Sequence, residues 1–255
     1  MNFINIEVQD YIATITYNRP PANATCYDAY IELRDAFYNI EKREDVKVVV
    51  FTSAGKIFMA GNELGEFGEF YERGKATAYY DTIRNAYLSV KNCAYPVVGA
   101  INGSSAGAGC AFAGCCDVLV AVQSAKFILS EIKVGIIGAD GFASLMVPEK
   151  VLRYMALSGN HVTAEQIHGW GGIHKVVATR EELLPAAQAV AKEFAANSRR
   201  ALMQWKKCLN ANYDHDLPKK FENNLRCTVE FQDYADFKEA SVAFIEKREP
   251  EFDNK

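Results

Sequence analysis

The sequence predicts an α/β fold, built from parallel βα units and followed by a mainly helical region. Three short runs, VKVVVFTSA from Val46, PVVGAIN from Pro96 and DVLVAV from Asp117, are rich in branched apolar residues. Such continuous apolar runs are typical of strands that are covered on both faces. Helical patterns separate them, and this alternation indicates right-handed βα crossovers with ligand sites beyond the carboxyl ends of the strands. A chain of 255 residues is long enough for one such domain with a helical appendage.

The first elements follow from hydrophobic spacing. Residues 4–18, INIEVQDYIATITYN, alternate polar and apolar side chains around Asp10-Tyr11, which predicts an antiparallel hairpin. Over residues 27–41, apolar side chains recur at helical spacing, which predicts an amphipathic helix. The run from Val46 then begins the buried part of the sheet.

Small residues dominate the middle of the chain. Residues 54–67 contain three glycines and predict a loop, and residues 76–93 predict a helix before the strand that starts at Pro96. The stretch GAINGSSAGAGCAFAGCC then predicts a helix that ends near Cys116, ahead of the third buried strand.

Beyond residue 150 the strand patterns fade and helices are predicted for most of the chain. The segments are 163–167, 169–177, 186–196, 199–230 and 233–252. The helix in the last segment is expected to end at Pro250. We therefore divide the chain into an α/β core, residues 1–195, and a helical region, residues 196–255.

Composition excludes several classes of protein. A net charge of −4 and a pI near 5.7 argue against a surface for nucleic acid or an anionic membrane, and no apolar run of ~20 residues is present. The seven cysteines are odd in number and the polar opening lacks a signal-peptide pattern, so a cytoplasmic protein is expected. Cys110, Cys115 and Cys116 lack a matching zinc-ligand pair, so buried thiols and no metal are expected.

Two loops that follow buried strands bring small residues to the start of a helix. They lie around Ala60-Gly61 and around Gly107-Ala108-Gly109. Backbone N–H groups there are unpaired and could converge on one oxygen as an oxyanion hole, although tight packing of a helix on the sheet explains the glycines equally well. Neither the dinucleotide fingerprint GxGxxG nor the P-loop GxxxxGK[ST] is present.

Six motifs in order resemble the enoyl-CoA hydratase/isomerase (crotonase) superfamily over essentially the whole chain. They are NRPPAN (18–23), SAGKIFMAGNELGEF (53–67), PVVGAINGSSAGAGCAFAGCCDVLVAVQSAKF (96–127), SEIKVGIIGADG (130–141), LSGNHVTAEQIHGWGGIHKVV (157–177) and AFIEKREPEF (243–252). The resemblance implies a spiral of ββα units and a C-terminal trimerisation region, hence a homotrimer or a dimer of trimers. It also implies a coenzyme A thioester as substrate without a separate cofactor, and oxyanion donors at the N–H groups of Ala60 and Ala108.

The catalytic carboxylates depart from the hydratase pattern. By resemblance, hydratases carry one glutamate at the position of Ala111 and a second at Glu131, here in Ser130-Glu131 rather than a PE pair. Asp140 stands where some family isomerases carry an acid, although an Asp in GADG also suits a turn or a helix N-cap. We predict Glu131 as the base, with or without Asp140, and a structural role for Asp117.

Substrate contacts are also assigned by resemblance, to Ala22, Phe58, Met59, Gly61, Asn62, Leu64 and Gly107. For Phe58, Met59, Leu64 and Phe67, core packing is the alternative. None of the four histidines (161, 168, 174 and 215) lies where the resemblance places a catalytic base.

The leading functional hypothesis is isomerisation of an enoyl-CoA double bond, because this reaction needs no bound water and suits the absence of an acid at Ala111. The alternatives are hydration or dehydration, including of a cyclic dienoyl-CoA, by Glu131 and Asp140, hydrolysis of a CoA thioester, and a non-catalytic CoA-binding or interaction protein.

Overall fold

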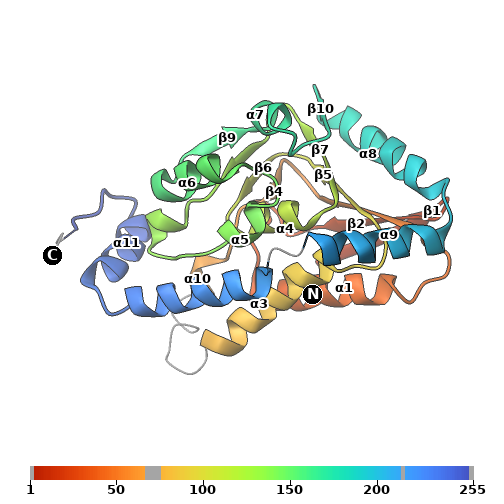
Figure 1. The fold of residues 1–255 in the computed structure, drawn as a ribbon. Coiled ribbons are helices and arrows are strands. Elements are labelled where there is room, and N and C mark those ends of the chain that lie inside the picture. The colour runs from red at the N-terminus through yellow and green to blue at the C-terminus, as the bar shows by residue number, and fades with distance from the viewer. Residues whose placement is uncertain (1–2, 67–75, 214–215, 253–255) are drawn as a thin grey trace.

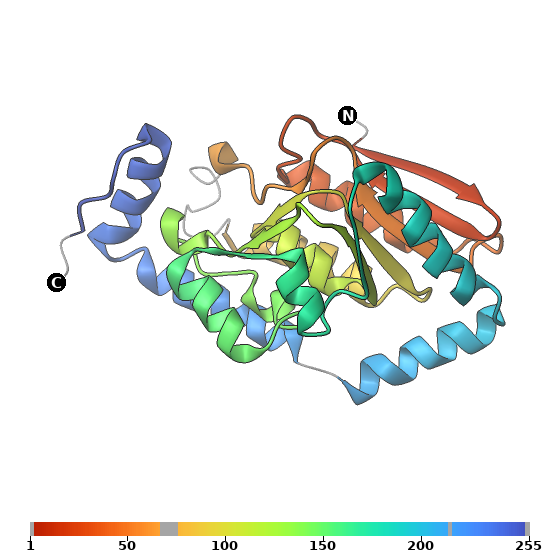
Figure 2. The same cartoon turned by 90° about the horizontal axis from the view of Figure 1, so that it is seen from above.

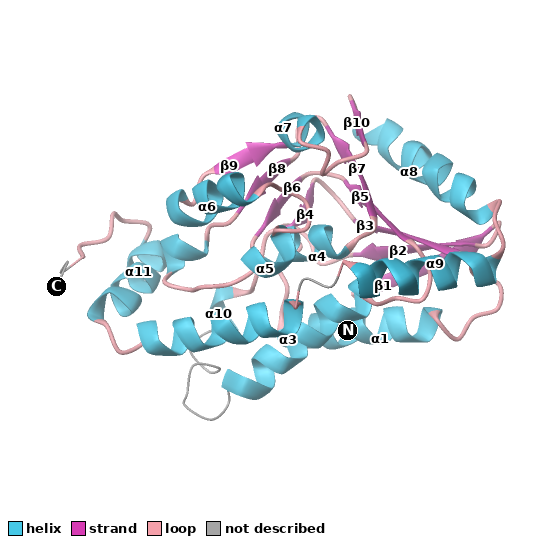
Figure 3. Ribbon diagram, viewed as in Figure 1, coloured by secondary structure: helices cyan, strands magenta, loops and turns pink. Residues whose placement is uncertain are grey.

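The computed structural model describes residues 3–66, 76–213 and 216–252 and shows two sheets surrounded by helices (Figures 1 and 3). The larger sheet has the order β1-β2-β3-β5-β7-β10 and the smaller one the order β4-β6-β8-β9. The strands of the larger sheet are β1 (Ile4–Gln9), β2 (Ile12–Tyr17), β3 (Val48–Ser53), β5 (Val97–Ile101), β7 (Val118–Val122) and β10 (Lys175–Val177). All its neighbouring pairs are parallel except β1 and β2. The predicted α/β class is confirmed.

The predicted elements at the N-terminus are confirmed. β1 and β2 form the antiparallel hairpin, and Asp10 and Tyr11 make its turn with φ of 53° and 64°. Helix α1 (Tyr27–Ile40) buries the apolar face that the spacing indicated, including Tyr30, Leu33 and Phe37. Every residue of β3 is buried, as expected for a strand covered on both faces.

The smaller sheet is a correction to the sequence prediction. Its strands are β4 (Ile57–Met59), β6 (Ser104–Ala106), β8 (Lys126–Ile128) and β9 (His161–Thr163). Residues 57–59 were predicted as part of a loop and 104–106 as part of a helix, which is in fact only α4 (Ala108–Cys115). β9 and β10 likewise lie in segments predicted as mainly helical. Strands of three residues are too short to show a period of two, so only pairing with neighbours reveals them.

Helices enclose the sheets. α8 (Arg180–Ala195) packs on β2, β3, β5, β7 and β10, whereas α1 contacts β1, β2 and α3 (Ala76–Lys91), and α3 contacts α4. The remaining elements of the core are η1 (Leu64–Glu66), η2 (Glu131–Val134), α5 (Asp140–Ala143), α6 (Glu149–Ser158) and α7 (Ala164–Gly169).

The C-terminal helices are α9 (Arg199–Asn212), α10 (Leu217–Phe231) and α11 (Ala235–Glu246). α11 ends four residues before Pro250, because Lys247 adopts a left-handed conformation with φ of 55°. Seen from above, α11 lies at the opposite end of the molecule from the β1–β2 hairpin (Figure 2). α10 contacts α3 and α5, and α11 contacts η2. The helical region thus packs on the core, and its division from the core at residue 195 stays a prediction.

Asp117 has the structural role that was predicted for it. Its Oδ2 accepts hydrogen bonds from the backbone N–H of Val97 and from Nζ of Lys206 on α9, both at 2.7 Å. The Lys206 side chain is only 5% exposed, and its ammonium also donates to the carbonyl of Tyr95. The pair therefore fixes α9 to the edge of the core.

Candidate active site

Two glycine-containing loops meet at the carboxyl ends of β4 and β6. A Cβ placed on Gly109 would lie 2.5 Å from the carbonyl oxygen of Met59. A Cβ on Gly61, where φ is +97°, would lie 3.3 Å from the carbonyl oxygen of Ala106. Only glycine allows such close approach of two backbones, and the sheet thereby brings the two predicted loops into direct contact.

The predicted oxyanion donors belong to these two loops. Ala60 directly follows β4, and Ala108 is the first residue of α4. The N–H of a first helical residue has no intrahelical acceptor and points out of the helix N-terminus, where the helix dipole favours negative charge. Gly107 precedes it with φ of +48° and donates its own N–H to the carbonyl of Ile128 at 2.9 Å.

The carboxylate of Glu131 lies against this helix N-terminus. A Cβ placed on Gly107 would lie 2.7 Å from Oε1 of Glu131, so the carboxylate occupies the space beside the glycine. Oε2 is buried and has no hydrogen-bond partner among the described residues. Burial raises the pKa of Glu131 from its ordinary value to about 8, and the nearby charge of Asp140 adds to the increase. Such a group is the stronger base once it has lost its proton.

Asp140 is the first residue of α5 and is held from outside its own helix. Its Oδ1 accepts a hydrogen bond of 2.7 Å from Nδ2 of Asn224, a buried residue of α10. One turn further on, the hydroxyl of Thr228 accepts from the backbone N–H of Ile137 at 3.1 Å and donates to its carbonyl at 3.0 Å. The loop that carries Asp140 is therefore fixed by α10.

The sequence reasoning missed Asn224 and Thr228. The available signal was two polar side chains four residues apart on one side of an otherwise amphipathic helix. Such a pair on a buried face indicates a specific hydrogen-bonding partner, because buried polar groups need one.

A cavity of about 700 Å³ adjoins Glu131 and Asp140, both of which line it. Its walls come from the segment 129–140 and from helices α6, α10 and α11. Neither Ala60 nor Ala108 is among the described residues that line it. Glu131 therefore stands between the junction of the two loops and the cavity.

The other predicted contact residues lie around the junction. Phe58 and Met59 are fully buried, and the Phe58 ring packs on Phe51 with 5.6 Å between centroids, which favours the core-packing alternative. Ala22 is half-buried in the connection between β2 and α1. Leu64 begins η1, but its side chain lies outside the described part of the structure, as does the whole of Phe67.

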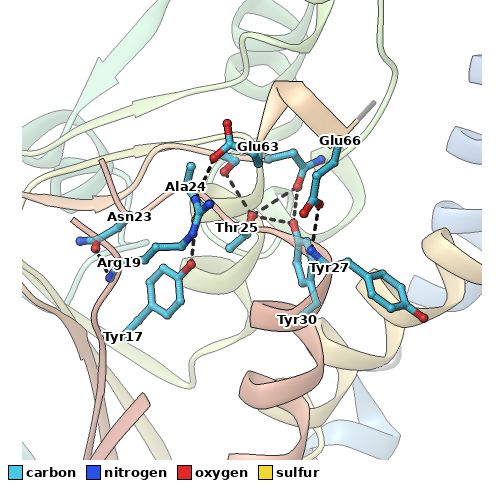
Figure 4. A network of polar contacts seen from close by, with 11 residues as sticks. Tyr17, Arg19, Asn23, Ala24, Thr25, Tyr27, Tyr30, Glu63 and Glu66 are labelled. Atoms are coloured by element: carbon cyan, nitrogen blue, oxygen red, sulfur yellow. Dashed lines mark hydrogen bonds and ion pairs between the residues drawn. The ribbon is translucent and has the colours of Figure 1, made fainter. Parts of the chain in front are cut away.

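A polar network joins the loop after β4 to the start of α1, where Thr25, Tyr30 and Glu66 come together (Figure 4). Asn62 also belongs to this network. Its Oδ1 accepts a hydrogen bond from the hydroxyl of Tyr30, which also receives one from Thr25 at 2.9 Å. Glu66 accepts from the N–H of Tyr27 at 2.9 Å. These bonds fix the chain after Gly61, and Nδ2 of Asn23 fixes it before Ala60 by donating to the carbonyl of Ile57 at 2.7 Å. The position of the Ala60 N–H is therefore set by the fold.

Ala111 is fully buried in α4 and is not one of the described residues that line the cavity. His161, His168 and His174 do not line it either, and His215 lies outside the described residues.

Four cysteines are buried, three are partly or fully exposed, and among the described residues no group of side chains could hold a metal ion. No helix in the described ranges is long and apolar enough to cross a membrane.

Comparisons with known proteins agree with this architecture. A sequence profile of the enoyl-CoA hydratase/isomerase family matches residues 7–255. The chain is 32% identical over 201 residues to a (7aS)-7a-methyl-1,5-dioxo-2,3,5,6,7,7a-hexahydro-1H-indene-carboxyl-CoA hydrolase from Rhodococcus jostii, covering 79% of this chain and 78% of the relative. It is 29% identical over 270 residues to 1,2-epoxyphenylacetyl-CoA isomerase from Escherichia coli, covering both chains completely.

A crystal structure of an enoyl-CoA hydratase from Mycobacterium avium subsp. paratuberculosis has the same fold, with a TM-score of 0.85, 22% identity and coverage of 98% of each chain. The chain belongs to the enoyl-CoA hydratase/isomerase family, that is, the crotonase superfamily. It is therefore a crotonase-type enzyme of acyl-CoA thioesters.

Proposed function

We propose that this enzyme moves the double bond of an enoyl-CoA thioester, with Glu131 as the base. The observation that carries the proposal is one buried carboxylate with a pKa near 8, placed between a helix N-terminus and a cavity. A reaction that transfers one proton between two carbons needs one such group. The buried methyl of Ala111, in place of a second acid, fits the same chemistry.

The proposed reaction balances within the substrate and one side chain. The ionised Glu131 removes a proton from the carbon next to the thioester carbonyl, and the electrons of that C–H bond pass into a dienolate. The N–H groups of Ala60 and Ala108 hold the negative oxygen. The protonated Glu131 then returns the proton to the carbon two positions further on, and the thioester carbonyl forms again.

Asp140 acts as a partner of Glu131 in this scheme. Its carboxylate accepts a hydrogen bond from the Asn224 amide, and its charge raises the pKa of Glu131. Its effect is to make Glu131 a stronger base when that residue is ionised. In the alternative of hydration or dehydration, Asp140 would instead share a water molecule with Glu131.

Hydrolysis is a second candidate, because two relatives at 32% and 33% identity are named CoA hydrolases. Relatives named as an isomerase and as a probable hydratase stand at 29%. Product analysis over 2-enoyl and 3-enoyl CoA esters separates these reactions. Isomerisation changes the thioester absorbance without a change of mass, hydration adds one water, and hydrolysis of the thioester releases a free thiol. A protein that binds but does not react would leave all three readouts unchanged.

The proposal includes a homotrimer or a dimer of trimers. It is supported by α9 and its C-cap residue, where Trp205, Leu209 and Tyr213 recur every four residues and are 66%, 47% and 65% exposed in the single chain. Such a stripe suits an interface between subunits. Sedimentation of the wild type and of Trp205→Glu tests it, because a monomeric wild type would contradict the assignment.

A further inference from the structure

The cavity beside Glu131 is much larger than a short acyl group requires. Its volume of about 700 Å³ is in the range that holds a drug-sized ligand. A four-carbon acyl group would leave most of this space without contacts. A larger group would fill it and remove its apolar walls from water.

Position makes this cavity the place for the distal part of an acyl group. Glu131 touches Gly107 on one side and lines the cavity on the other. Glu131 exchanges a proton with a substrate carbon while the thioester carbonyl faces Ala108. In this arrangement the rest of the acyl group extends past Glu131. The apolar wall there includes Leu129, Ile136, Leu152, Ala156, Phe231 and Ala240.

The charges on the cavity wall disfavour a negative group at the far end of the acyl group. Four acidic side chains line it: Glu131, whose pKa of about 8 leaves it largely protonated at neutral pH, and Asp140, Glu149 and Asp236. Arg153 is the single cation among the described lining residues, and its Nε already donates to Glu149 at 2.8 Å. A carboxylate on the far end of an acyl group would therefore meet net negative charge, with no unpaired cation among the described lining residues to bind it.

We propose that the substrates are CoA thioesters of large, uncharged, apolar acyl groups, a chain of about ten carbons or a ring system of similar size. This inference rests on the proposed function for the direction of the acyl group, but it can be tested by binding alone. Saturated thioesters cannot be isomerised, so their affinity depends on the cavity and not on the chemistry.

The test is calorimetry with butyryl-CoA, decanoyl-CoA, naphthylacetyl-CoA and 9-carboxynonanoyl-CoA. Each buried methylene is worth about fourfold in affinity before ordering costs, so at least one large neutral thioester should bind at least ~30-fold more tightly than butyryl-CoA. The terminal carboxylate should reduce the affinity of the ten-carbon chain by at least ~10-fold. Equal affinities across acyl size, or tight binding of the carboxylated chain, would overturn the proposal.

Ala156→Phe narrows the cavity from α6. It should reduce the affinity for the preferred large thioester by at least ~10-fold and change the affinity for butyryl-CoA by less than about threefold. The retained binding of butyryl-CoA also shows that the variant is folded. Ala189→Phe, at an exposed position of α8, is the matched control and should change neither. If Ala156→Phe does not fold, the wild-type series decides alone. The product assay does not depend on these binding measurements. An enzyme that prefers large acyl groups but is not an isomerase is therefore distinguishable from an isomerase without a size preference.

Discussion

The carboxylate of Glu131 and the α-carbon of Gly107 are packed so closely that a β-carbon on the glycine would lie 2.7 Å from Oε1. The two residues come from different units of the chain, at the start of η2 and immediately before α4. The glycine therefore serves the position of the carboxylate as well as the turn into the helix, where φ is +48°.

Gly107→Ala should displace Glu131 and strain the turn. We expect kcat to fall by at least ~10²-fold, since proton transfer depends strongly on distance. The matched control is Gly169→Ala in α7, where an added β-carbon meets nothing within 4 Å and φ is not positive. Its rate should equal that of the wild type. A fully active Gly107→Ala protein would show that the contact with Gly107 does not position Glu131 for catalysis.

The rate should depend on the ionisation of Glu131. Because the base must lose its proton before it can accept one, kcat/KM should rise with pH and level off above about 8, the pKa that burial gives this residue. Glu131→Gln should be nearly inactive at every pH. A profile that is flat from pH 5 to 9 would contradict this role.

The same ionisation should lower the stability of the folded protein at alkaline pH. The pKa of Glu131 is about 8 in the folded state, against an ordinary value of 4.5. Between pH 4.5 and pH 8 the folded protein keeps the proton that the unfolded chain has lost. The contribution of Glu131 to the free energy of unfolding is therefore greatest below pH 4.5 and falls as the pH rises to 8. Glu131→Gln should therefore be more stable than the wild type at pH 9, by on the order of 1–4 kcal/mol. Denaturation curves at pH 5 and pH 9 measure the difference, and a variant that is less stable at pH 9 would contradict the buried carboxylate.

Asp140→Asn should affect both the rate and the pH profile. Proton transfer should slow by on the order of 10²–10⁴-fold if Asp140 is a partner acid. Because the charge of Asp140 raises the pKa of Glu131, the rising limb of the profile should also move to lower pH. Asn224→Ala should reproduce part of the loss without unfolding α10. Asn223→Ala, at the neighbouring exposed position of the same helix, is the matched control and should change neither the rate nor the profile. A rate within threefold of the wild type and an unmoved profile would make Asp140 a turn residue.

Ala108→Pro tests the oxyanion donor, because proline is tolerated at the first position of a helix and its Cδ replaces the amide hydrogen. Turnover should fall by at least ~10²-fold while the fold is retained. The affinity for a saturated acyl-CoA should fall as well, because the ring carbon occupies the place where the amide hydrogen would meet the thioester oxygen. A folded variant with undiminished turnover would remove Ala108 from the site.

Ala111→Glu examines the absent second acid. By resemblance to the hydratases, a glutamate here would face Glu131 and could share a water molecule with it. The position is fully buried, so two carboxylates would repel each other, the pKa of at least one would rise, and the protein would lose stability. We expect a small gain in 3-hydroxyacyl product from crotonyl-CoA. Efficient hydration by the wild type would instead favour the pair Glu131 and Asp140 as a hydratase.

The sequence by itself determined the family, the α/β class and the long elements. The six ordered motifs identified the superfamily, and apolar runs and helical spacing located β3, β5, β7, α1 and α3, because burial on one or both faces leaves a periodic record in the chain. It also named Glu131, Asp140, Ala60 and Ala108, whose roles remain predictions.

Tertiary structure alone decided where those residues stand. The three-residue strands β4, β6, β8 and β9 leave no period in the sequence, and they are what bring the two glycine loops together. Burial raises the pKa of Glu131, and this residue lines a cavity whose other walls come from α6, α10 and α11, which follow it in the chain. The bond from Asn224 to Asp140 spans 84 positions. Desolvation and hydrogen bonding act through space, so no local pattern in the sequence encodes them.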